Sequence, residues 1–107
     1  MVFDISEVEG IGEYREGGVY EKLDLVELIY MIPDTEKVFL IVNLKNGEQK
    51  TVEVRCDNNL SRVLQEKYES VMESRYFGRG GVEVVLSGQL PMSEINDLVR
   101  LSYNLTK

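Results

Sequence analysis

The stretch KVFLIVNLKNGEQKTVEVR, residues 37–55, decides the fold of this chain. It places two apolar segments on either side of Asn46-Gly47, a dipeptide that tolerates the positive φ angles of a tight hairpin turn. Residues 38–42 are an unbroken apolar run, whereas Val52 and Val54 alternate with polar residues in the period-2 pattern of a half-buried strand. The stretch therefore predicts an antiparallel hairpin at the centre of the protein.

The flanking segments extend this hairpin into an α+β pattern. Upstream, an apolar stretch ends at the turn signal Pro33-Asp34, and downstream Asp57 or Asn58 can cap a helix whose apolar residues share one face. Pro91 suits the first turn of a final helix. The expected elements are strands at 24–32, 37–45, 49–56 and 82–86, and helices near 59–76 and 91–105. The expected core residues are Phe39, Ile41, Val54, Leu64, Val85 and Leu98. This is a two-layer α+β domain: an antiparallel β-meander plus a fourth strand, packed against two main helices.

The N-terminal residues 1–22 carry a weaker signal. Glycines at positions 10, 12, 17 and 18 argue against a long helix, because each glycine in a helix interior costs about 1 kcal/mol relative to alanine. We expect a short strand or helical turn, then a loop. From Val19 onward the chain should be extended, with the edge of the sheet near Tyr20.

The bulk composition indicates one globular domain over residues 1–107. A hydrophobic fraction of 43% with 29% charged residues is ordinary for a folded protein. No apolar run approaches the length of a membrane span, and no basic-then-apolar leader is present, so no membrane association is expected. A single cysteine, Cys56, permits no internal disulfide and fits a cytoplasmic location.

The charge is distributed unevenly. Residues 1–36 contain ten acidic and two basic residues, whereas residues 37–107 contain nine acidic and ten basic ones, which together give the net charge of −7. This balance argues against indiscriminate binding to a polyanion. The acidic third instead offers a face for a basic protein partner, with Glu7, Glu9, Glu13 and Glu16 as its candidate contacts.

Catalytic and metal-binding chemistry has little support in the sequence. The absence of histidine excludes Ser-His-Asp and Cys-His catalysis and every histidine-based metal site. Cys56 has no obvious base and is interpreted as a small apolar filler. The pairs Glu7/Glu9 and Asp34/Glu36 lack the spacing of a calcium loop. We therefore expect no catalytic residue, no metal, no cofactor and no enzymatic activity.

Nucleic-acid contacts are a second possibility. Tyr76, Phe77 and Arg79 combine two aromatic rings with a guanidinium, a combination that stacks on bases and contacts phosphates. Arg75 precedes them, and Lys45 and Lys50 flank the hairpin tip. The alternatives are an aromatic pair that tucks into the core, tip lysines that only aid solubility, and an Arg79 that pairs with Glu73 or Glu83. Residues 78–81, GRGG, lack the lysine and serine or threonine of a phosphate loop.

Several segments resemble the MmcQ/YjbR family of small bacterial proteins. The family's strand pair ending in Lys-Cys-Asp is similar to residues 51–57, TVEVRCD. Its strand that ends in Asp-Gly before a proline is similar to residues 84–91, VVLSGQLP, and its helix ending in Ser-Tyr is similar to Ser102-Tyr103. Upstream, Lys37 and Phe39 stand at the matching places of a family hairpin. The family's Asn-Lys and His-Trp pairs are absent from residues 76–81, and residues 1–23 diverge from its first helix.

The resemblance implies a double-wing fold, a CyaY-like two-layer arrangement, and DNA as a candidate partner. The first functional interpretation is therefore a non-enzymatic regulatory protein that binds nucleic acid through Lys45, Lys50, Arg75, Tyr76 and Arg79. The alternative is an acidic interaction module or inhibitor that presents residues 1–36 to a basic protein. The resemblance favours the first interpretation and the charge distribution favours the second.

Overall fold

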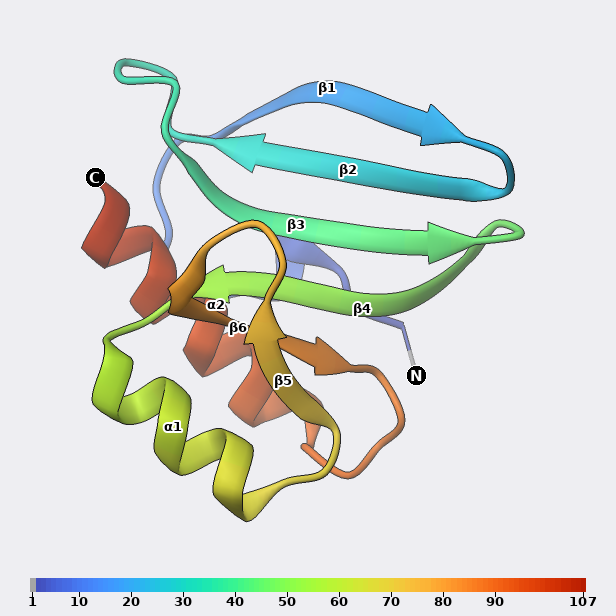
Figure 1. The fold of residues 1–107 in the computed structure, drawn as a ribbon. Coiled ribbons are helices and arrows are strands. Elements are labelled where there is room, and N and C mark those ends of the chain that lie inside the picture. Colours follow the sequence, from blue (N-terminus) through green and yellow to red (C-terminus); the bar gives the residue numbers. More distant parts are fainter. Residues whose placement is uncertain (1) are drawn as a thin grey trace.

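The computed structural model, which describes residues 2–107, is a six-stranded antiparallel sheet with both helices on one face (Figure 1). The strand order is β1-β2-β3-β4-β6-β5. The side chains of Val19 and Tyr20 lie outside the described part. The predicted α+β architecture is confirmed. Its elements are η1 (Ile5–Glu7), β1 (Arg15–Lys22), β2 (Leu25–Met31), β3 (Val38–Lys45), β4 (Glu48–Arg55), α1 (Asn58–Lys67), β5 (Val71–Ser74), β6 (Gly78–Val85) and α2 (Met92–Thr106).

The hairpin of β3 and β4 forms as its sequence predicts. Asn46 and Gly47 both have positive φ angles, 52° and 77°, and Lys45 pairs with Glu48 across the turn. Because β2 and β6 pair on either side, both strands of the hairpin are central in the sheet. The first six residues of β3 are all buried, which explains why that strand is apolar without alternation.

A β-bulge at Phe39 shapes the contact between this hairpin and α2. Tyr30 pairs with Leu40 and Met31 pairs with Val38, so Phe39 is an extra residue in β3. Its side chain is fully buried in the core and packs edge to face against the Tyr103 ring, with 5.1 Å between the two ring centres. The bulge thus directs an aromatic side chain at α2.

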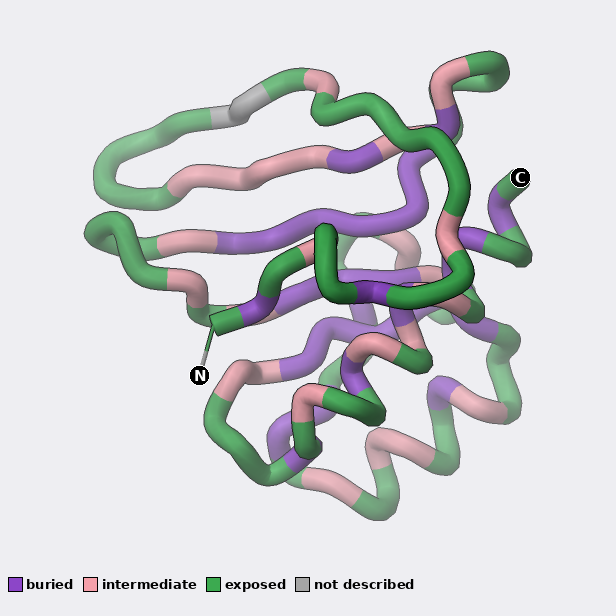
Figure 2. Tube along the Cα trace, turned by 180° about the vertical axis from the view of Figure 1, so that it is seen from behind, coloured by how far each residue is buried: buried purple, intermediate pink, exposed green. Residues whose placement is uncertain are grey.

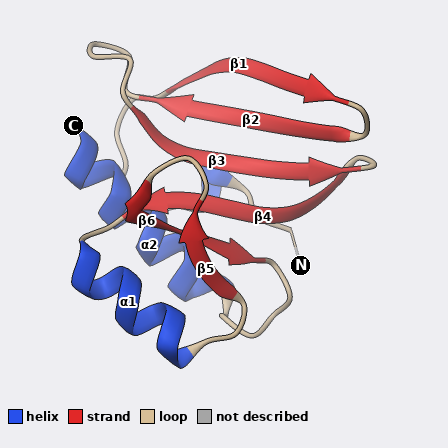
Figure 3. Cartoon of the chain, viewed as in Figure 1, coloured by secondary structure: helices blue, strands red, loops and turns tan. Residues whose placement is uncertain are grey.

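The helices form the second layer of the molecule (Figure 3). α2 packs on β3 and β4, and α1 packs on β5 and β6. The N-terminal segment, residues 2–14, completes this layer (Figure 2). Phe3 is buried, and its backbone N–H and carbonyl both bond to the side-chain amide of Gln49, at 2.7 and 2.9 Å.

The helix predicted near residues 59–76 is too long. α1 ends at Lys67, and residues 71–74 form β5 at the sheet edge. Val71 and Met72 lie at helical spacing from Leu64, but only Val71 is buried, and Met72 is 42% exposed on the other face. Tertiary hydrogen bonds explain the change: the Ser70 N–H donates to Gln89 Oε1 and the Ser70 carbonyl accepts from Val85 N, both at 2.8 Å.

Other predicted details also change. Gly78 does not end a helix but begins β6 with φ 62°. β1 is an edge strand, as expected near Tyr20, but it already begins at Arg15, where a loop is predicted. Of the predicted core residues, Phe39, Ile41 and Val54 are fully buried, whereas Leu64, Val85 and Leu98 are half-buried. Ile41 lies outside the main apolar cluster, which contains Phe39 and Val54. Among residues 2–107, no helix has the length and apolar character needed to cross a membrane.

Phe39→Ala should lower the free energy of unfolding by about 3–5 kcal/mol, because it leaves a cavity between the sheet and α2. Denaturant unfolding followed by circular dichroism measures this change. Leu23→Ala is the control, since Leu23 is 85% exposed in the β1–β2 turn and its loss should be small. A Phe39→Asp variant that folds cooperatively would contradict the assigned burial.

Candidate functional site

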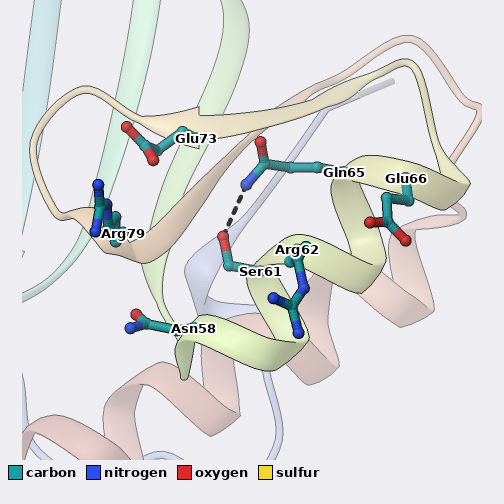
Figure 4. Close-up of a pocket in the computed structure, with 7 residues that line it drawn as sticks. All are labelled: Asn58, Ser61, Arg62, Gln65, Glu66, Glu73 and Arg79. Carbon is teal, nitrogen blue, oxygen red and sulfur yellow. Dashed lines mark hydrogen bonds between the residues drawn. The ribbon is translucent and has the colours of Figure 1, made fainter.

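An open groove, here called the polar groove, separates α1 from the β5–β6 hairpin (Figure 4). Its volume is about 530 Å³. Both walls carry charged or amide side chains, and each wall contributes one arginine. The lining residues are Asn58, Ser61, Arg62, Gln65 and Glu66 on α1, and Glu73 and Arg79 on the hairpin.

Local chemistry sets the position of the helix wall. The Asp57 carboxylate caps α1 by accepting a hydrogen bond from the Leu60 N–H at 2.8 Å. Ser61, only 2% exposed, donates its hydroxyl to the Gly81 carbonyl at 3.0 Å and accepts from Gln65 Nε2 at 2.9 Å. Gly81 is required here, because a Cβ atom would lie 2.5 Å from the Val54 carbonyl oxygen. The helix therefore sits at a fixed distance from β6.

The two arginines of the groove extend from opposite walls (Figure 4). Arg79 is exposed between Gly78 and Gly80, and Arg62 is exposed on the second turn of α1. Within residues 2–107, neither guanidinium forms an ion pair. The predicted alternative that Arg79 pairs with Glu73 or Glu83 is therefore wrong.

Glu83 is instead held by Arg75. The two side chains form a double hydrogen bond, with Arg75 Nε and one terminal nitrogen at 2.9 and 3.0 Å from the carboxylate oxygens. Thr51 Oγ1 also donates to this carboxylate, at 2.7 Å. The hydrogen bonds that Arg75 donates to the Glu83 carboxylate raise the pKa of the Arg75 guanidinium. Arg75, a predicted nucleic-acid contact, thus has a structural partner on the helix-free face of the sheet.

A second buried carboxylate, Glu53, ties the turn at residues 75–77 to the centre of the sheet. Glu53 is 2% exposed and lies directly across from Glu83 in the strand register. It accepts hydrogen bonds from Ser74 Oγ at 2.8 Å, from Tyr76 N at 3.1 Å and from Asn43 Nδ2 at 2.8 Å. The sequence analysis missed this network, although glutamates flanked by valines in both β4 and β6 were a readable signal.

The turn exposes one aromatic ring and buries part of another. Tyr76 is 55% exposed, and Phe77 is half-buried, with the Arg55 guanidinium 4.8 Å from the centre of its ring. The Tyr76 and Phe77 rings pack edge to face, with 5.0 Å between their centres. The predicted alternative of an aromatic pair tucked into the core therefore applies to Phe77 only. The Tyr76 ring remains largely exposed to solvent.

The structure separates the predicted lysines from this turn. Lys45 pairs with Glu48 at one end of β4, and Gly81 pairs with Arg55 at the other end, about 23 Å away along the strand. The Lys50 ammonium contacts the Glu48 carboxylate at 2.9 Å. Lys45 and Lys50 therefore belong to a different surface from Tyr76 and Arg79.

Three of the predicted acidic contacts, Glu7, Glu9 and Glu13, lie on the N-terminal segment, and Glu16 lies on β1. Arg100 donates to the Glu9 carbonyl at 3.1 Å, and the Tyr103 hydroxyl donates to the Glu13 carbonyl at 3.0 Å. Glycines at positions 10 and 12 allow this approach, because a Cβ atom at either would lie within 3 Å of α2 side chains. The side chains of Glu7, Glu9, Glu13 and Glu16 are all exposed.

Cys56, the one cysteine of the sequence, is buried. It is 4% exposed, and burial, together with the charge of Asp57, raises the pKa of its thiol to about 11. Its interpretation as an apolar filler is confirmed.

Within residues 2–107, no group of three or more acidic, cysteine or histidine side chains is arranged to hold a metal ion.

The fold is shared with proteins of known structure. A Pseudomonas syringae protein solved by structural genomics superposes with a TM-score of 0.69 at 17% identity, over 88% of this chain and 87% of that one. A Deinococcus radiodurans protein, DR2400, which carries a DUF419 domain, superposes with a TM-score of 0.71 at 15% identity, over 94% and 72%. These likenesses establish the fold. No protein-family model and no curated protein matches the sequence.

Arg75→Ala should destabilise the protein by about 1–3 kcal/mol, because Glu83 stays buried without its charged donor. Denaturant unfolding measures the loss. Replacing Glu83 by glutamine in the same chain should restore much of it, because the amide needs no counter-charge. Arg62→Ala is the matched control, since it removes an exposed arginine without a buried partner. An Arg75→Ala variant as stable as the control would show that solvent alone satisfies Glu83.

Proposed function

We propose that this chain is a non-enzymatic, double-wing protein of the MmcQ/YjbR type that binds single-stranded nucleic acid in the polar groove. The observation that supports this proposal is the placement of Arg62 and Arg79, which lie on opposite walls without an ion pair among the described residues. A phosphate between two such guanidiniums receives donors from both sides.

The other lining groups suit a nucleotide better than a simple anion. Gln65 and Asn58 offer amide donors and acceptors, and Glu66 and Glu73 accept hydrogen bonds from base amino groups or ribose hydroxyls. Tyr76, in the turn between β5 and β6, adds an exposed ring on which a base of the same strand can stack. A ligand with alternating phosphates and polar bases matches this combination.

The charge of the chain favours a single strand over a duplex. Among the described residues, Lys45 and Lys50 lie at the far end of the sheet and Arg75 binds Glu83, so these three do not extend the two arginines into a continuous basic surface. With a net charge of −7, the protein should bind only a few phosphates, so its affinity should fall with salt by a modest slope of about 0.7 per phosphate contacted. Unpaired bases supply the stacking that such a small site requires.

Arg79→Ala should weaken binding of oligo-dT or oligo-U by about tenfold at low salt, because one charged phosphate contact is lost. The slope of log affinity against log salt should become shallower by about 0.7. Fluorescence anisotropy titrations at several salt concentrations measure both. Comparison of the DNA and RNA strands shows which sugar the groove prefers.

Lys45→Ala is the matched control, since it removes the same charge about 23 Å away. Equal effects of the two variants would indicate non-specific attraction rather than a groove site. A wild-type protein with no salt-dependent binding at low ionic strength would exclude the proposal.

A second candidate function is supported by the N-terminal segment. Its contacts with Arg100 and Tyr103 use backbone carbonyls, so the glutamate side chains remain directed to solvent. A pre-ordered row of carboxylates suits a Lys- and Arg-rich protein segment, because little conformational entropy is lost on binding. In this alternative the chain is an acidic interaction module or inhibitor.

Changing Glu7, Glu9, Glu13 and Glu16 together to glutamine should weaken binding of a lysine- and arginine-rich peptide by about tenfold at low ionic strength. Isothermal titration calorimetry measures the affinity. The control changes four exposed acids of residues 37–107 to glutamine: Glu66, Glu69, Glu73 and Glu94. Equal losses in both variants would show that net charge alone attracts the peptide.

A further inference from the structure

α1 has a second groove on its other side, here called the apolar groove, between α1 and α2. Its volume is about 330 Å³. Apolar side chains dominate both walls: Val63, Leu64 and Tyr68 on α1, and Leu98 and Leu101 on α2 with Leu90 before it. The sequence analysis assigned this side of α1 to the core, but the two helices leave it partly open.

Several of these apolar side chains face solvent. Val63 is 53% exposed, Leu101 is 37% exposed, and Leu105, one turn beyond Leu101, is 55% exposed. On α2, Leu98, Leu101 and Leu105 form a stripe separate from the buried residues that contact the sheet. A helix needs only one apolar stripe to pack on a sheet, so the second stripe indicates a second contact surface on α2.

The charges at the rim differ between the two walls. Lys67 lies on the α1 wall, and Glu94 lies on the α2 wall. Asp97 also lines the α2 wall but contacts Arg100 on its own helix. The two helices run in roughly opposite directions on the same face of the sheet, so the last turn of α1 lies near the first turn of α2 (Figure 1). Lys67 and Glu94 are therefore at similar levels along the groove.

We propose that a second copy of this chain covers the apolar groove, related to the first by a two-fold axis that runs along it. This rotation places α1 of one copy over α2 of the other. Each residue keeps its position along the groove axis. Lys67 then meets the partner's Glu94, twice by symmetry, while Val63 lies level with the partner's Leu98 and next to the partner's Leu101. Positive charge on one wall and negative charge on the other is the arrangement that a self-complementary surface requires.

This proposal does not depend on the nucleic-acid proposal. Ser61, Arg62 and Gln65 face the polar groove, whereas Val63, Leu64 and Lys67 face the apolar groove. Dimerisation therefore leaves both polar grooves of the pair open. The small number of exposed apolar residues fits a weak dimer, with a dissociation constant of about 1–100 µM.

Sedimentation equilibrium of the full chain over a range of concentrations tests the proposal. The wild type should show a monomer–dimer equilibrium, and Leu101→Asp should weaken it at least about tenfold, because a carboxylate is then buried in the interface. Leu23→Asp, a leucine 85% exposed in the β1–β2 turn, is the control and should leave it unchanged. Circular dichroism confirms that each variant is folded.

A charge exchange tests the orientation of the two copies. Lys67→Glu should weaken the dimer, because it places like charges together, and adding Glu94→Lys should restore it. Failure of the double variant to recover would overturn the two-fold arrangement. A wild type that stays monomeric to about 1 mM would overturn self-association and leave the groove to a different partner.

Discussion

The hydroxyl group of Ser102 joins the second helix to both strands of the central hairpin. It donates to the Phe39 carbonyl at 2.6 Å and accepts from the Arg55 N–H at 2.8 Å. The residue is completely buried. The bulge at Phe39 and the end of β4 would otherwise leave these backbone groups without partners in the core, at a cost of about 1–3 kcal/mol each. One small polar residue thus fixes where α2 lies, and the N-terminal segment in turn packs beside α2.

The centre of the sheet, in β3, β4 and β6, is buried on both faces, but by different means. Apolar side chains and the helices cover one face, whereas a hydrogen-bonded polar network lies on the other, around Glu53 and Glu83. A buried carboxylate is costly unless its oxygens are satisfied, and here Ser74, Arg75 and the backbone of Tyr76 supply the donors. These donors come from the end of β5 and the turn that follows. The position of the turn, and therefore of Tyr76 and Arg79, is set by the requirements of two buried glutamates.

α1 separates two grooves of opposite chemistry. The helix is short because tertiary hydrogen bonds of Ser70 direct the chain into β5. Charged and amide side chains line one side, and apolar side chains line the other. A single helix with two different faces toward solvent is well suited to hold a ligand on one side and a second protein chain on the other.

Local sequence determined the parts of this protein in which one physical requirement dominates. The Asn46-Gly47 turn follows from the allowed φ angles of those residues, the burial of β3 follows from its unbroken apolar run, and the start of α1 follows from the Asp57 cap. Each of these features depends on residues close together in the chain. The sequence also placed Tyr76 and Arg79 close together along the chain, and the structure has them in the turn before β6 and at the start of β6.

Only the tertiary structure decided the features that depend on distant partners. Residues 71–74 have a pattern that fits a helix, and they become a strand because β6 offers an edge with free hydrogen-bonding groups. The sequence predicts that Arg75 contacts nucleic acid, but Glu83, eight residues away, binds it. It also predicts one surface for Lys45, Lys50 and Arg79, but the length of a strand separates Lys45 from Arg79. Charge composition does not specify which opposite charges meet. That pairing is set by strand register, and register is a property of the assembled sheet.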